Sequence, residues 1–143
     1  MYNLNNIENI IAMCRYSDEL KDLVWNNATI KEGYNPDIYR LDPCGAWMQK
    51  DKYNDRNSDL GWEIDHIYPQ ALLKERGAEI DEIDTVENLR AMNWHNNVSK
   101  GIDYPVYHIA IKAEDDRNTL ADEEYEVNKE RQEILKKIFS KYI

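Results

Sequence analysis

Apolar residues at helical intervals predict two helices at the start of the chain. The first is favoured within residues 4–14. The second is predicted to begin after Ser17, a typical N-cap, because Asp18 and Glu19 follow in the first turn, and to end near residues 26–27. We expect the two helices to pack against each other as a hairpin.

The next segments show the patterns of short strands. Residues 38–41 and 46–48 are β-prone and flank the turn sequence at 42–45, which predicts a β-hairpin. Residues 62–67 alternate between apolar and polar side chains up to Pro69, where a strand is expected to end.

A long excursion separates this strand from the next one. It is predicted to hold a short helix at 71–76 and an acidic loop at 79–84. A second strand is expected at 89–92, followed by a helix over 94–101 that Asn93 caps. The predicted order is strand, excursion, strand, helix.

The last part of the chain is predicted to form one strand and one long helix. Residues 106–111 are β-prone, and residues 120–143 are expected to form a terminal helix. Its apolar stripe consists of Val127, Ile134, Leu135, Ile138 and Phe139. Together these elements predict an α+β fold.

Composition narrows the class of protein. With 143 residues, 42% of them hydrophobic and 32% charged, the chain is expected to form a single domain over residues 1–143. Cys14 and Cys44 form no C-x-x-C pair. The chain lacks the basic start of a secretory signal and any segment of membrane-spanning length, so a cytoplasmic protein without membrane contact is expected.

Polar residues that can carry chemistry are predicted to converge at the end of the 62–67 strand. Asp65 and His66 lie near this end, Asn88 begins the next strand, and Asn97 lies in the first turns of the following helix. An Asp-His pair alone can equally be a structural hydrogen bond, and Asn97 alone can be an ordinary helix-start asparagine. Their placement makes convergence of these polar groups possible.

The segments "DHIYPQ" and "ENLRAMNWHNNVSKG" resemble the HNH endonuclease motif. Asn88 matches the middle asparagine, Asn97 follows at the third position nine residues later, and Lys100 stands where a basic residue often follows. This H-N-N variant is similar to the HNH domain of RNA-guided CRISPR nucleases, which reads D-H-I-x-P-Q. The resemblance covers about residues 62–101 and can extend to the hairpin at 41–53.

The resemblance implies a ββα-metal core that cleaves DNA. Helical flanks at 1–32 and 120–143 would surround it as an N-terminal helical hairpin and a C-terminal helix. Many family members hold this fold with cysteines on a structural zinc. The corresponding later positions here are Asn93 and Asn96, so no structural zinc is expected.

The residue types suit phosphodiester hydrolysis. His66, with an ordinary pKa near 6.5, can accept the proton of an attacking water at neutral pH. Asp65 and Asn97 offer oxygen ligands for one divalent cation, Mg²⁺ or Mn²⁺ in preference to zinc. By resemblance, Asn88 would steady the loop and the imidazole of His66 without binding the metal.

Several nearby residues admit two interpretations. Lys100, Arg90 and Arg56 are candidate phosphate contacts or ordinary surface charges. His95 can be a ligand or an exposed helical histidine, and Glu63 can bind a metal-bound water or simply face solvent.

The formal net charge of −10 is unusual for a protein that binds many phosphates. The acidic runs at 79–84 and 122–126 are predicted to be solvated. We therefore keep two functional hypotheses. The first is a metal-dependent HNH endonuclease for which duplex DNA is the favoured substrate and RNA is also allowed. The second is a catalytically silent acidic module of the same fold that binds a protein partner.

Overall fold

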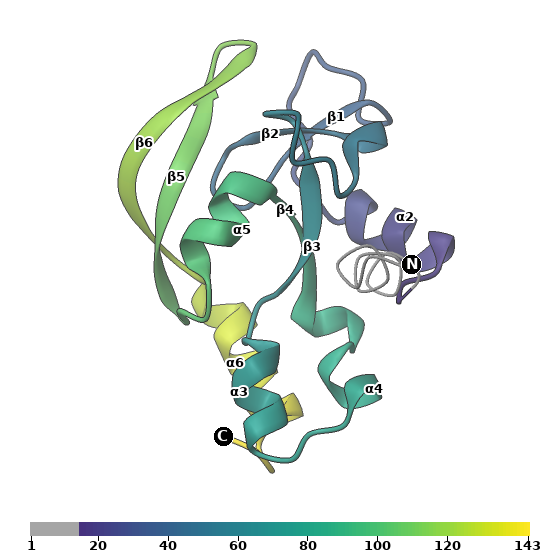
Figure 1. Ribbon diagram of the computed structural model, residues 1–143, viewed down its shortest axis with the longest axis vertical. Coiled ribbons are helices and arrows are strands. Elements are labelled where there is room, and N and C mark those ends of the chain that lie inside the picture. Colours follow the sequence, from purple (N-terminus) through teal and green to yellow (C-terminus); the bar gives the residue numbers. More distant parts are fainter. Residues whose placement is uncertain (1–14) are drawn as a thin grey trace, which may run out of the picture.

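The computed structural model describes residues 15–143 and shows an α+β fold (Figure 1). The described elements are α2 (Asp18–Asn26), β1 (Tyr39–Leu41), β2 (Trp47–Gln49), β3 (Trp62–His66), α3 (Gln70–Glu75), α4 (Ile80–Ile83), β4 (Leu89–Asn93), α5 (Trp94–Lys100), β5 (Val106–Glu114), β6 (Arg117–Glu126) and α6 (Lys129–Ile138). The strands form three two-stranded antiparallel sheets: β1 with β2, β3 with β4, and β5 with β6. None of the helices between residues 15 and 143 has the length and apolar character that a bilayer crossing requires.

Helix α2 and the β1–β2 hairpin, which precede the central strands, form where the sequence predicts them. The Ser17 hydroxyl accepts a hydrogen bond from the Leu20 backbone N–H at 3.1 Å, so α2 begins where the N-cap predicts. The predicted hairpin forms from β1 and β2, with Arg40 opposite Met48. The predicted first helix at 4–14, and with it the helical hairpin, lies outside the described residues.

The pair β3–β4 runs through the middle of the molecule, with α5 and the β5–β6 ribbon on one side and α2 on the other (Figure 1). Antiparallel pairing places Asp65 opposite Arg90 and His66 opposite Leu89. The Asn93 side chain accepts from the His95 N–H, and Gly101, with φ of 54°, ends α5. The predicted strand, excursion, strand, helix order is confirmed.

The predicted acidic loop at 79–84 was partly wrong, because it contains helix α4. The Glu79 backbone N–H donates to the Glu82 side chain at 3.1 Å, which stabilises the first turn. Ile83 is fully buried and anchors the helix in the core. This short segment therefore packs against the protein despite its charge.

The predicted terminal helix at 120–143 was wrong over its first part. Residues 117–126 form β6, which pairs with β5 along nearly its whole length. Helix α6 begins only after Asn128, whose side chain accepts from the Arg131 N–H at 2.7 Å. Leu120 is 92% exposed, so it contributes nothing to an apolar stripe.

Two hydrophobic clusters hold the central strands. One lies between α2, β2 and the β3–β4 pair and includes Val24, Trp25, Met48, Trp62, Ile64, Leu89 and Ala91. The other joins the excursion to β5 and α6 and includes Ile67, Tyr68, Leu73, Ile83, Tyr107, Ile109, Val127, Leu135 and Phe139. The end of β3 lies where the two clusters meet, so packing fixes the backbone of Asp65 and His66 from both sides.

A buried carboxylate connects the β1–β2 hairpin to the central elements. Asp42 is 1% exposed. Its Oδ1 accepts from the backbone N–H groups of Cys44 and Ala46, each at 2.9 Å. Its Oδ2 accepts from the Asn93 backbone N–H at 3.2 Å and from Asn96 Nδ2 at 3.1 Å. Asp42 thereby ties the hairpin turn to the start of α5.

Candidate active site

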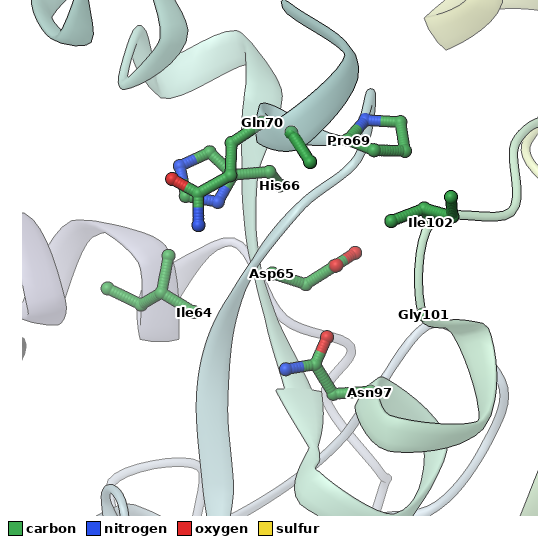
Figure 2. Close-up of a pocket in the computed structure, with 9 residues that line it drawn as sticks. Ile64, Asp65, His66, Pro69, Gln70, Asn97, Gly101 and Ile102 are labelled. Carbon is green, nitrogen blue, oxygen red and sulfur yellow. The ribbon is translucent and has the colours of Figure 1, made fainter. Parts of the chain in front are cut away.

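Three of the residues selected from the sequence line one cavity. Asp65 and His66 are the last two residues of β3, and Asn97 comes from α5. The cavity has a volume of about 270 Å³. Its other lining residues are Ile64, Pro69, Gln70, Ala71, Gly101 and Ile102 (Figure 2). Of the four polar residues expected to converge, Asp65, His66 and Asn97 line this cavity, whereas Asn88 is not among its lining residues.

The Asn97 side chain is oriented by a neighbouring carboxylate. Its Nδ2 donates to Glu63 Oε1 at 2.9 Å. Because this bond uses the amide nitrogen, the amide oxygen is turned toward Asp65 (Figure 2). Arg56 donates to both oxygens of Glu63, at 2.7 and 2.9 Å, and so fixes the carboxylate that orients Asn97. Glu63 is thus a partner of Asn97 and Arg56.

Two cations, one buried and one partly buried, flank Asp65, which is 5% exposed. Arg90 Nε donates to Asp65 Oδ2 at 2.9 Å, and Lys100 Nζ lies 3.4 Å from Oδ1. Lys100 Nζ also donates to the backbone oxygen of His66 at 3.1 Å. Burial lowers the pKa of the Lys100 ammonium, although the Asp65 carboxylate acts in the opposite direction. The two positive charges offset the free-energy cost of burying the Asp65 carboxylate, which also lines the cavity.

The three basic residues selected as phosphate contacts are all paired with carboxylates. Lys100 and Arg90 have side chains that are only 1% and 12% exposed, and both lie against Asp65. Only Arg56 is at the surface, with a side chain that is 57% exposed and bound to Glu63. Charged side chains are rarely buried unless paired, so their burial was not expected from the sequence.

His66 is buried and contacts Asp84, a carboxylate from the acidic run 79–84 that was predicted to be solvated. Its Nε2 lies 2.7 Å from Asp84 Oδ1 and 3.4 Å from the Tyr16 hydroxyl. Burial lowers the pKa of His66 below its ordinary value, and the hydrogen bond to Asp84 opposes this shift only in part. This lower pKa favours the neutral imidazole, the form that can accept a proton.

Asn88 is fully buried and holds the chain just after His66. Its Oδ1 accepts from the Tyr68 backbone N–H at 2.7 Å, and its Nδ2 donates to the backbone oxygens of Tyr68 and Ile83. Asn88 thus connects the segment after β3 to the end of α4. Its predicted effect on the imidazole stays a prediction, and would be transmitted through this loop.

His95 lies outside the cavity. Its ring stacks on Trp94, with 3.6 Å between ring centroids, and its Nε2 lies 3.3 Å from Asp59 Oδ1. These contacts favour the interpretation of His95 as a surface residue of α5.

A cation at this site would have few protein ligands. Among the described residues, no group of three or more His, Cys, Asp or Glu side chains is arranged to hold a metal ion. Asp65 and Asn97 supply one carboxylate and one amide oxygen, a hard donor pair that fits Mg²⁺ or Mn²⁺ with water and substrate oxygens completing the shell. No protein-family model matches the chain, and searches of curated proteins and of solved structures found no match either.

Proposed function

We propose that the protein is a metal-dependent DNA endonuclease of the HNH type, with a ββα-metal core formed by β3, β4 and α5. One observation carries this proposal: Asp65, His66 and Asn97 line a single cavity at the end of β3. The resemblance of the motif assigns a base to His66 and metal ligands to the other two residues. The geometry is consistent with these roles.

The reaction is water attack on a phosphodiester. His66 accepts a proton from the water, the water oxygen bonds to phosphorus, and the bond from phosphorus to the 3′ oxygen breaks. The 3′ oxygen takes up a proton from solvent, so the products carry a 5′-phosphate and a 3′-hydroxyl, as the family resemblance implies. A divalent cation held by Asp65 and Asn97 would polarise a phosphoryl oxygen and stabilise the departing 3′ oxygen. Arg90 and Lys100 hold Asp65 in place.

A panel of end-labelled substrates tests this function. We expect the purified protein to cut duplex DNA with Mg²⁺ or Mn²⁺ and not with EDTA. Single-stranded DNA and RNA in the same panel determine the substrate class. Absence of metal-dependent cleavage on every substrate would overturn the proposal.

The second candidate is a catalytically silent module that binds a protein partner through its acidic surface. The net charge of −10 favours it, together with the pairing of Lys100, Arg90 and Arg56 to carboxylates. We favour the nuclease because a silent module has no need for a buried histidine that lines a cavity with Asp65 and Asn97.

The cation site makes a prediction about metal affinity. Asp65→Ala should weaken Mn²⁺ binding by about 10-fold or more, which corresponds to about 1.4 kcal/mol, and Asn97→Ala by less because it removes a neutral ligand. Calorimetric titration measures both, with Asp37→Ala, an exposed acid before β1, as the matched control. If both variants bind Mn²⁺ as the wild type does, the cation site is elsewhere.

The paired cations make a prediction about salt. Each neutralised phosphate contributes about −0.9 to the slope of log affinity against log salt. Because the three candidate phosphate contacts are already paired with carboxylates, we expect a slope of about −2 or shallower. Fluorescence anisotropy with the His66→Ala variant measures this without cleavage, and Mg²⁺ should strengthen binding relative to EDTA. A slope near about −8 would require many more phosphate contacts than this site offers and would contradict the prediction.

A further inference from the structure

Asp84 contacts the candidate base from another part of the chain. It follows α4, eighteen residues after His66, yet its Oδ1 lies 2.7 Å from His66 Nε2. The two side chains are 15% and 8% exposed, so water competes little for this hydrogen bond. The sequence motif that selects His66 does not include Asp84.

Arg15 fixes the position of this carboxylate. Its Nε donates to Asp84 Oδ2 at 2.8 Å and its Nη2 to Oδ1 at 2.6 Å, which is the bidentate geometry of a guanidinium on a carboxylate. Its Nη1 donates to Gln70 Oε1 at 2.9 Å, and Gln70 lines the cavity. The carboxylate is therefore held at both oxygens and cannot rotate away from His66.

The contact determines which nitrogen of the neutral imidazole is free. A carboxylate only accepts hydrogen bonds, and a neutral imidazole has one donor and one acceptor nitrogen. Nε2 must therefore carry the proton that is donated to Asp84, which leaves the lone pair on Nδ1. A base needs its lone pair on the nitrogen that meets the attacking water.

We propose that Asp84, held by Arg15, is a positioning residue that keeps His66 in the tautomer with its lone pair on Nδ1. Its importance for cleavage rests on the proposed nuclease function, whereas the tautomer itself does not. An Asn at position 84 cannot replace the carboxylate. Its amide would turn its NH₂ group toward either Arg15 or His66, so the single imidazole orientation would be lost.

The tautomer can be measured directly in the full-length protein. The chain has three histidines, so the ring nitrogens of ¹⁵N-histidine-labelled protein can be assigned with His66→Ala as the reference. At a pH where His66 is neutral, we expect a pyrrole-like Nε2 and a pyridine-like Nδ1 in the wild type. In Asp84→Asn the two resonances should move toward each other as both tautomers become populated. Asp81→Asn, an exposed acid of α4, is the matched control and should leave them unchanged.

Cleavage rates then test the consequence. Asp84→Asn should slow cleavage by about 10- to 100-fold, less than the loss of the base itself, which contributes about 10²–10⁴. Arg15→Gln keeps the carboxylate and removes the bidentate contact, so it should shift the His66 resonances and slow cleavage in the same direction but by less. Arg15→Gln also tests the role of Asp84 if the Asp84→Asn variant fails to fold.

The outcomes separate the two proposals. A pyridine-like Nε2 in the wild type, or unchanged ring resonances in both variants, would overturn the role of Asp84. If the expected tautomers are observed but no form of the protein cleaves DNA, Asp84 still orients His66, and the result contradicts the nuclease function instead.

Discussion

His66→Ala should slow DNA cleavage by about 10²–10⁴-fold, the usual contribution of a general base. The same change should leave Mn²⁺ affinity unaltered, because we propose His66 as the base and Asp65 and Asn97 as the ligands. Single-turnover cleavage of a labelled duplex measures the first effect, and calorimetric titration with Mn²⁺ measures the second.

The control for this variant is His95→Ala, which removes a histidine that stacks on Trp94 outside the cavity. It should cleave as the wild type does. Loss of Mn²⁺ binding in His66→Ala would show that His66 is a ligand. Wild-type cleavage by His66→Ala would place the base elsewhere.

Asp42→Ala should lower the free energy of unfolding by about 3–5 kcal/mol, the range typical of breaking a buried polar network. The change removes the acceptor for the N–H groups of Cys44, Ala46, Asn93 and Asn96 and leaves these donors buried. Urea unfolding measures the loss.

Asp37→Ala is the control for stability, since it removes an exposed acid and should change the free energy of unfolding by no more than about 0.5 kcal/mol. A loss below about 1 kcal/mol in Asp42→Ala would mean that the network does not hold the hairpin to α5.

The Asp42 network includes Asn93 and Asn96. If the proposed HNH resemblance holds, these two residues stand where many family members carry cysteines that bind zinc, and in this chain both donate to Asp42. A zinc ion would contribute folding free energy through its ligands. In this chain, hydrogen bonds to the buried Asp42 carboxylate join the β1–β2 turn to the start of α5.

The elements around the site were predictable because their signals are local. Strand β3 follows from alternation up to Pro69, and α5 follows from the cap at Asn93 and the glycine at 101. The signals at 117–126 were misleading, since these acidic residues form a strand only by pairing with β5. Such pairing depends on contacts that no local pattern encodes.

The residues of the site were likewise predictable only where the signal is local. Asp65, His66 and Asn97 follow from motif spacing, whereas Asp84 meets His66 only because helices α3 and α4 fold the excursion back. The burial of Lys100 and Arg90 could not be predicted either. Both side chains lie against Asp65 in the folded protein. The sequence alone does not show this tertiary contact.

The most direct test of a metal-dependent cleavage site at Asp65, His66 and Asn97 is the conversion of supercoiled plasmid. Wild-type and His66→Ala proteins, purified identically, are incubated with plasmid and either Mn²⁺, Mg²⁺ or EDTA. We expect nicked or linear plasmid only from the wild type and only with metal. Equal conversion by both proteins, or no conversion by the wild type with either metal, would contradict the proposed site.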